Sequence, residues 1–213
     1  MRRFLGMAAA GVAGVLLAGT GPAAAQSAEA LNLSGDAAVR SGNLTRAFEQ
    51  YSAAIGANPF HARALRNRAR VHFYRADFVA AAEDFRIAGS VDSTNAYSLL
   101  WRYVAEARAG LDDRAGLAAG AGAVREGWPK PLVLFFLGRT KADAVFAAAA
   151  ADPQLAAERM CEARFFLAQR HLLAAEKGDA AGQLRLAAEA CPAGMVERHA
   201  ARIELDRLNA AAR

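Results

Sequence analysis

The sequence is poor in the patterns that carry out catalysis or hold metal ions. Its four histidines are His61, His72, His171 and His199. None of them belongs to an HExxH pattern, and none has a cysteine or another histidine at a metal-ligand spacing. The chain has neither a glycine-rich phosphate loop nor a nucleophile elbow. The adjacent Asp112 and Asp113 fall between two expected helices, where the capping of a helix N-terminus explains an acidic residue. We therefore expect no enzymatic activity, no catalytic residue, no metal site and no cofactor.

Three arginines offer binding chemistry instead. Arg63, Arg66 and Arg70 are spaced i, i+3 and i+7, which places them on one stripe of a helix. A guanidinium group grips a carboxylate with two parallel hydrogen bonds, so such a stripe suits an extended peptide that carries carboxylates. The other interpretation is a solvated, arginine-rich helix face. In that case the apolar residues around Phe135 and Phe136 are the next candidate surface.

The elements that must position these residues form a repeat of helix pairs. One window begins at Leu31 and a matching one begins at Leu65, 34 residues later. Counted from repeat starts at residues 28 and 62, a small residue recurs at the eighth place, alanine at the twentieth and twenty-seventh places, and an aromatic residue at the twenty-fourth. The aligned pairs are Leu31 and Leu65, Gly35 and Ala69, Ala47 and Ala81, Tyr51 and Phe85, and Ala54 and Ala88. This is the tetratricopeptide repeat (TPR) pattern, in which small residues let two antiparallel helices approach closely. We predict an all-α TPR solenoid.

Two further copies come later in the chain. The third starts near Ala96 and keeps Gly110, but Ala119 replaces the aromatic residue, so a looser second helix is expected. The last clear copy starts at Cys161, and the final segment "GMVERHAARIELDRL" is predicted to be a helix that caps it. That helix would place four apolar residues on one side: Val196, Ala200, Ile203 and Leu208. His72 and His171 take the eleventh place of their repeats, where half-buried packing is expected.

The segment "WPKPLVLFFLG", residues 128–138, interrupts the repeats. Its leucines and glycine match the start of a first helix that would begin at Pro131, where proline costs little. A buried strand is the alternative, but no partner strand is visible, and the segment is too short to span a membrane. The pair Asp152 and Pro153 breaks the second half of this irregular copy. We predict repeats one to three over residues 26–127, an irregular repeat over 128–160, and a last repeat with its capping helix over 161–213.

A TPR array offers a groove lined by its first helices, and the second, fifth and ninth places of each helix usually face it. This rule, together with the adjacent Asn67 and Trp101, gives the candidate partner-binding residues Asn32, Asp36, Arg63, Arg66, Asn67, Arg70, Tyr97 and Trp101. Within this set Trp101 is expected to be an apolar anchor, since tryptophan and arginine dominate the energies of interfaces. Asp36 opposes the binding of a carboxylate.

The N-terminal segment has the order of a secretory signal peptide. Arg2 and Arg3 precede an apolar stretch, and small residues come after it, so we expect removal of residues 1–25. An uncleaved anchor is the alternative. Thr20 stands where a lipoprotein signal would have its acylated cysteine. Cleavage would lower the net charge from +5 to +3, because two basic residues and no acidic residue leave. That charge is too mild to indicate nucleic-acid binding.

Cys161 and Cys191 are the only cysteines, and they take the first and thirty-first places of one repeat. In an antiparallel helix pair the start of the first helix lies beside the end of the second. In an exported protein, two cysteines placed in this way are predicted to form a disulfide. Two buried free thiols are the alternative, and two cysteines alone are a weak metal site.

The segment from Trp128 to Leu208 resembles the NlpI-like family of bacterial envelope TPR proteins. The resemblance rests on "WP" followed by "FFLG", then "CEARFFLAQ", a Gly-Asp turn, "CP" and "VERHAARIEL". It implies a periplasmic, typically dimeric scaffold that gathers cell-wall hydrolases and a protease. Thr20 departs from the lipidated cysteine of many members, and Ala168 stands where the motif usually has glycine. We therefore expect a non-enzymatic adaptor in the periplasm. A TPR module of a secretion or polysaccharide-export machine is the alternative.

Overall fold

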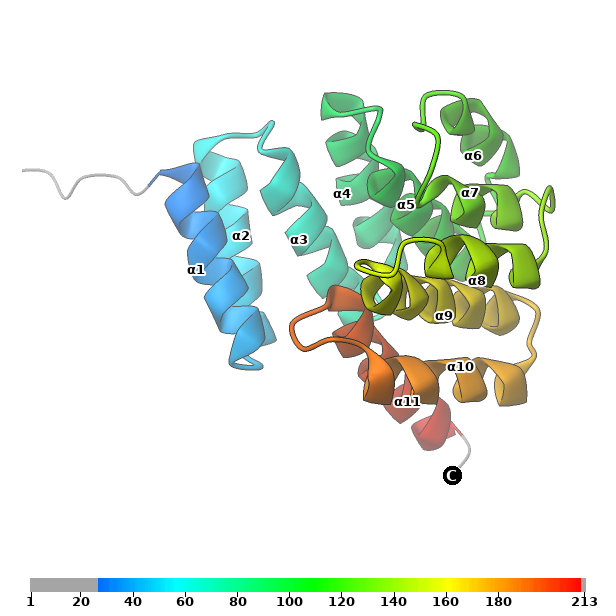
Figure 1. Cartoon of the computed structure of the whole chain (residues 1–213). Coiled ribbons are helices and arrows are strands. Elements are labelled where there is room, and N and C mark those ends of the chain that lie inside the picture. The colour runs from blue at the N-terminus through cyan, green and yellow to red at the C-terminus, as the bar shows by residue number, and fades with distance from the viewer. Residues whose placement is uncertain (1–26, 212–213) are drawn as a thin grey trace, which may run out of the picture.

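The computed structural model describes residues 27–211, and its regular structure is entirely α-helical (Figure 1). The signal peptide predicted for residues 1–25 lies outside this range. The helices of the described range are α1 (Ala28–Arg40), α2 (Leu44–Ala57), α3 (Ala62–Tyr74), α4 (Phe78–Val91), α5 (Ala96–Arg108), α6 (Arg114–Ala121), α7 (Lys130–Phe136), α8 (Ala142–Ala150), α9 (Ala156–Leu173), α10 (Lys177–Ala190) and α11 (Val196–Ala211). Within residues 27–211, no helix has both the length and the apolar character needed to cross a bilayer.

Helices that are consecutive in the chain pack side by side. The closest pairs are α1 with α2, α3 with α4, and α9 with α10, and α4 also packs on α5 of the next pair. This arrangement confirms the predicted all-α helical-repeat solenoid.

The small and aromatic places of the repeat pattern explain why the pairs fit. A Cβ atom on Gly35 would clash with the ring of Tyr51, so the eighth place of the first repeat has no room for a side chain. Both residues are buried. The equivalent places of the second and last repeats are also buried: Ala69, Ala81, Phe85, Ala88, Ala168, Ala180, Leu184 and Ala187. The places that define the pattern therefore form the contacts between helices.

The turn inside each pair repeats a single backbone conformation. Gly42, Ala76 and Gly110 stand 34 residues apart and have φ angles of 77°, 61° and 83°. Ala175 takes the same place in the last repeat, with a φ of 60°. The period thus extends into the third repeat. Its second helix, α6, has 8 residues and is shorter than the 14-residue second helices α2 and α4.

The middle of the chain forms two short helices, α7 and α8. In α7 the side chains of Leu132, Val133 and Phe136 are buried, and the strand alternative for this segment is wrong. Helix α8 ends before Asp152, as expected. Helix α9 begins at Ala156, so the last pair starts inside the segment predicted to be irregular.

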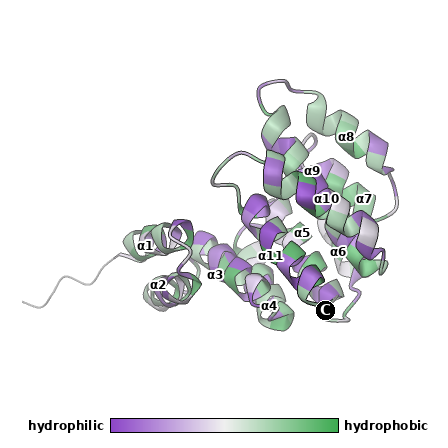
Figure 2. Cartoon of the chain, turned by 90° about the horizontal axis from the view of Figure 1, so that it is seen from below, coloured by the Kyte–Doolittle hydropathy of each residue, from purple (hydrophilic) through white to green (hydrophobic). Residues whose placement is uncertain are grey.

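The C-terminal helix α11 packs against α10 and α9, as a cap would, and it also reaches the second repeat (Figures 1 and 2). Arg207 donates hydrogen bonds to the backbone carbonyls of Phe73 and Tyr74 at the end of α3. Arg108 of α5 donates to Glu204 at 3.2 and 3.3 Å. The chain therefore folds back on itself, and one apolar core runs from Ala69 to Ala201.

Candidate partner-binding groove

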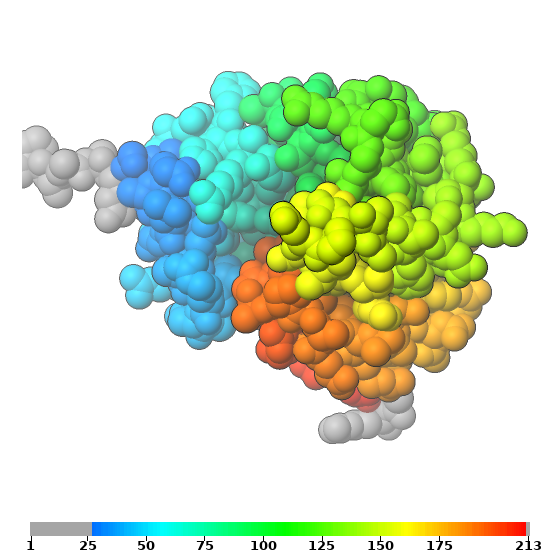
Figure 3. Space-filling model, viewed as in Figure 1, coloured from blue at the N-terminus to red at the C-terminus, as the bar shows by residue number. Residues whose placement is uncertain are grey.

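A groove lies between the first helices α1 and α3 and the segment 193–196, which ends at the first residue of α11. It has a volume of about 410 Å³ and continues past Val39, Tyr74 and Val196 into a second hollow of about 470 Å³. Figure 3 shows a recess between the blue N-terminal repeat and the orange segment, with the teal surface of the second repeat at its bottom. We call the two hollows together the basic groove. Its charged and titratable lining residues include six arginines, one histidine and one acid: Arg40, Arg63, Arg66, Arg70, Arg198, Arg202, His199 and Asp36.

Helix α3 sets the positions of the three predicted arginines. It begins after His61, whose Nδ1 accepts a hydrogen bond from the backbone N–H of Ala64 at 3.1 Å. Arg63 comes two residues after this cap and donates to Glu29 at 3.1 Å and to Asp36 at 2.7 Å. The positive charge of Arg63 is therefore neutralised by two acidic residues of the protein itself. This arginine is not free to bind the carboxylate of a ligand.

Arg66 and Arg70 differ from Arg63 because no carboxylate pairs with them among residues 27–211. Arg70 Nη1 donates to the side-chain oxygen of Asn67 at 2.8 Å. Arg66 Nη1 and Arg70 Nε are buried and have no hydrogen-bond partner in the described part of the chain. Burial lowers the pKa of Arg66, and the positive charges of Arg70 and Arg63 lower it further, against the opposing effect of Asp92. Two desolvated guanidinium groups that lack an acid favour the binding of an anion.

The prediction that Trp101 anchors a ligand is wrong. Trp101 is fully buried and packs on Phe73, Phe85 and Phe165, with ring centroids 4.9–5.8 Å apart. Phe165 belongs to α9, which covers the face of α5 that a simple array would leave open.

Two other predicted groove residues also lie outside the lining. Tyr97 donates its hydroxyl to Glu162 at 2.9 Å, so α9 covers this residue too. Asn32 is fully buried, and its side-chain oxygen accepts from Asn67 at 2.9 Å. The structure therefore brings together Asp36, Arg63, Arg66, Asn67 and Arg70. In the alternative surface around Phe135 and Phe136, Phe136 is buried and packs on Phe135, which is only half-buried.

The sequence interpretation missed the wall that the C-terminal part contributes. Tyr74 donates its hydroxyl to the backbone carbonyl of Val196 at 3.4 Å, which joins the two walls of the groove. Arg198 and Arg202 stand four residues apart on the first turns of α11 and line the second hollow. In the sequence, the only signal for these two arginines was their spacing on one helix face. That spacing does not show which helices lie opposite them.

A disulfide fixes the segment that forms this wall. Cys161 of α9 and Cys191, the residue that ends α10, are joined, with their Cα atoms 5.0 Å apart. This confirms the predicted pair and excludes free thiols in the structure. The segment 193–196 begins two residues after Cys191, so the bond holds the start of the C-terminal wall against α9.

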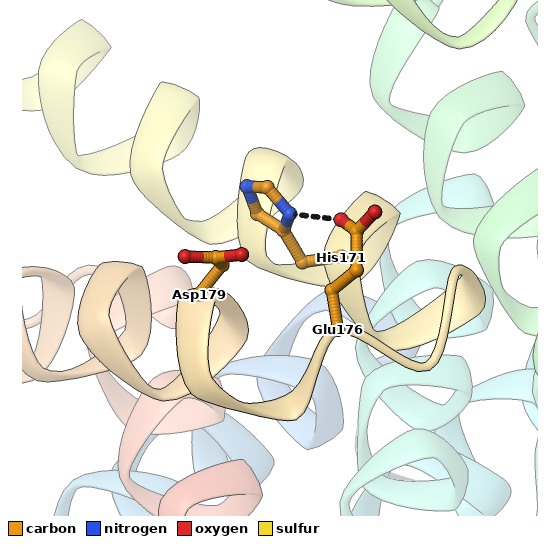
Figure 4. A group of neighbouring side chains, drawn as sticks. All are labelled: His171, Glu176 and Asp179. Carbon is orange, nitrogen blue, oxygen red and sulfur yellow. Dashed lines mark hydrogen bonds and ion pairs between the residues drawn. The ribbon is translucent and has the colours of Figure 1, made fainter.

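A group of possible metal ligands lies at the turn between α9 and α10. Suitable atoms of His171, Glu176 and Asp179 lie within 4.8 Å of one another, and His171 Nδ1 is 2.6 Å from the Glu176 carboxylate (Figure 4). The same bridge recurs in the second repeat, where His72 Nδ1 is 3.0 Å from Asp77. No acidic residue takes the third place there. Because the bridge forms without a third ligand, we assign it to joining the two helices of a repeat. Both histidines are half-buried, as expected.

Acidic residues elsewhere serve the fold. Asp113 caps α6 by accepting from the backbone N–H of Gly116 at 2.8 Å, which confirms the role expected for this pair of aspartates. Asp112 accepts from the hydroxyl of Tyr103 at 2.9 Å. The basic groove, by contrast, contains two buried arginine donors that have no partner among residues 27–211. Neither a protein-family model nor a curated protein matches the chain.

Proposed function

We propose that the protein is a non-enzymatic adaptor that holds an acidic segment of a protein partner in the basic groove. The observation that carries this proposal is the pair Arg66 and Arg70, which line an open groove without a carboxylate partner among residues 27–211. A carboxylate that binds there supplies the missing acceptors, and it gains more from a desolvated guanidinium than from a solvated one. The two hollows share Val39, Tyr74 and Val196 in their walls, so together they form a larger site than either hollow alone.

We further propose that the adaptor acts in the periplasm. The predicted signal peptide and the disulfide support an exported protein, since such bonds persist in oxidising compartments. The resemblance to NlpI-like proteins supports a scaffold, with homodimers, for cell-wall hydrolases or a protease. A module of a secretion or polysaccharide-export machine is the second candidate, and the same groove would serve it.

A capture experiment from envelope extract tests this proposal. The bait is the chain without residues 1–25, and the test variant is Arg66→Gln with Arg70→Gln. Arg63 is left unchanged, because its loss would free Glu29 and Asp36 and confuse the result. The matched control is Arg46→Gln with Arg185→Gln, which removes the same charge from exposed places on α2 and α10.

We expect the parent and the control to retain a hydrolase or a protease that the test variant loses. Components of a secretion or export machine in its place would support the second candidate. Equal capture by all three baits would contradict a role for the groove.

A further inference from the structure

A buried carboxyl group, that of Glu197, lies next to the basic groove, and the half-buried carboxyl group of Glu162 acts on it. Glu197 is in the first turn of α11, one residue after the groove residue Val196, and is only 4% exposed. No ion pair reaches its carboxyl group from any residue of the range 27–211, and its own backbone N–H donates to it. A buried carboxylate without a partner is costly, so the neutral form of Glu197 is favoured.

The second carboxyl group, Glu162 of α9, is held by two neutral donors. Tyr97 of α5 donates to it at 2.9 Å, and Trp128 Nε1 donates at 2.5 Å. Burial raises the pKa of Glu162, and these two hydrogen bonds oppose that rise by supporting the ionised form. A negative charge on Glu162 then opposes a second one on Glu197.

Arg70 of α3, which lines the groove, has the opposite effect on the pKa of Glu197. Burial raises the pKa of Glu197 to about 7, the charge of Glu162 adds to the rise, and the positive charge of Arg70 lowers it. The other titratable side chains that interact with Glu197 are the hydroxyls of Tyr74 from α3 and Tyr97 from α5. Arg70 lines the same hollow as Val196, the residue before Glu197, so its charge acts both on the buried carboxyl group and on an anion in the groove.

We infer that the binding of an anionic segment in the basic groove is coupled to the uptake of a proton by Glu197. This inference rests on the proposed function and names how the site is regulated. An anion that pairs with Arg70 cancels the positive charge that favours ionised Glu197, so the carboxyl group takes up a proton. Conversely, ionised Glu197 attracts Arg70 and repels the anionic ligand. Thermodynamic linkage makes the effect of binding on protonation equal to the effect of protonation on binding.

The affinity of the groove for an anion should fall as the pH rises. Protonated protein binds the anion more tightly, so affinity is highest below about pH 7 and declines above it. A coupling in the range usual between two sites would lower the affinity about fivefold or more at high pH. The protein would thus release an acidic partner as its surroundings become alkaline.

Calorimetric titration with an acetylated hexa-aspartate peptide tests the inference. The charge of this probe stays constant from about pH 6 to about pH 8.5, because aspartate titrates near 4. Repeating the titration in buffers of different ionisation enthalpy gives the number of protons taken up per peptide bound. The test variant is Glu197→Gln, and the control is Glu189→Gln, which makes the same change at an exposed place on α10.

His199 is the other titratable group that requires a control, because it lines the second hollow. Burial lowers its pKa, and the charge of Arg202 lowers it further, so any proton that it gains is taken up in more acidic solution. A His199→Gln variant should keep the proton uptake near neutral pH that the parent shows.

The outcomes separate the two levels of the proposal. We expect a fraction of a proton to be taken up near pH 7.5 by the parent and by Glu189→Gln, and none by Glu197→Gln. The last variant should bind at high pH as tightly as the parent binds at low pH. Binding without this proton uptake, or uptake that persists in Glu197→Gln, would overturn the coupling and leave the groove in place. A parent that does not bind the peptide at low ionic strength would overturn both.

Discussion

Three arginines on one helix stripe have different roles because their neighbours differ. Arg63 is paired with Glu29 and Asp36, whereas Arg66 and Arg70 keep unpaired donors beside the groove. The spacing of these residues in the sequence placed all three on one face correctly. It could not show that the acids of α1 neutralise one of them, because Glu29 lies 34 residues before Arg63.

At the residue scale, Glu197→Gln should change how stability depends on pH. The pKa of Glu197 is about 7 in the folded protein and is raised from 4.5, so the folded state binds a proton that the unfolded state has lost between these values. The parent should lose stability as the pH rises from about 4.5 to about 7. The variant should avoid this loss, which is on the order of 2–3 kcal/mol for a shift of this size. Urea unfolding across this pH range measures the difference, and parallel curves for parent and variant would contradict it.

The disulfide makes a second prediction at this scale. Replacing Cys161 and Cys191 with serine opens a loop that spans 30 residues. The chain-entropy model gives a loss of roughly 3–4 kcal/mol for such a loop, to be measured by urea unfolding. Peptide mapping without reductant should find the two cysteine peptides joined. Alkylation of both thiols in freshly isolated native protein would show that the bond does not form.

At the scale of elements, the turn inside two of the helix pairs holds an alanine in a strained backbone conformation. Gly42 and Gly110 meet the left-handed backbone of this turn without cost, but Ala76 and Ala175 adopt the same conformation with a Cβ atom. The pattern of small and aromatic residues defined the helix pairs, because these contacts are local in the chain. The turn conformation is predictable from the same period once Gly42 and Gly110 are aligned with Ala76.

Ala76→Gly should therefore stabilise the protein. Glycine has no Cβ atom to clash in the left-handed region, and we expect a gain of about 0.5–1 kcal/mol in the free energy of unfolding. The matched control is Ala53→Gly on the exposed side of α2, which should lose about the same amount because glycine weakens a helix interior. Thermal melts of both variants measure these changes in stability. A loss of stability at both sites would contradict backbone strain at Ala76.

Prediction from the sequence failed where distant elements meet. Trp101 occupies a place that faces the groove in a simple array, yet α9 covers it with Phe165 and Phe166. These contacts join residues more than 60 positions apart, and the repeat pattern holds no information about them. For the same reason the C-terminal wall of the groove was not foreseen.

At the scale of the whole molecule, one helix closes the structure. Glu204 of α11 is almost fully buried and accepts from both Arg108 of α5 and Arg207. Arg207 in turn binds the end of α3. This network joins the last helix to the second and third repeats, and it keeps the segment 193–196 opposite α1 and α3.

Glu204→Ala should therefore destabilise the entire fold and not only its C-terminus. The change leaves two partly buried guanidinium groups without their carboxylate, which costs about 3 kcal/mol or more. Glu189→Ala, at an exposed place on α10, should stay within about 0.5 kcal/mol of the parent. Urea unfolding compares them, and a loss at Glu204 as small as that of the control would mean that the network does not hold α11 in place.

The central claim is that an acidic segment binds between α1, α3 and the start of α11. The most direct test is a map of backbone amide chemical shifts during titration with hexa-aspartate, at low ionic strength and about pH 6.5, where the groove should bind best. We predict shifts along α1, α3 and residues 193–202, and none when Arg66 and Arg70 are both glutamine. Shifts confined to α6 and α8, or a map that the double variant leaves unchanged, would contradict the account.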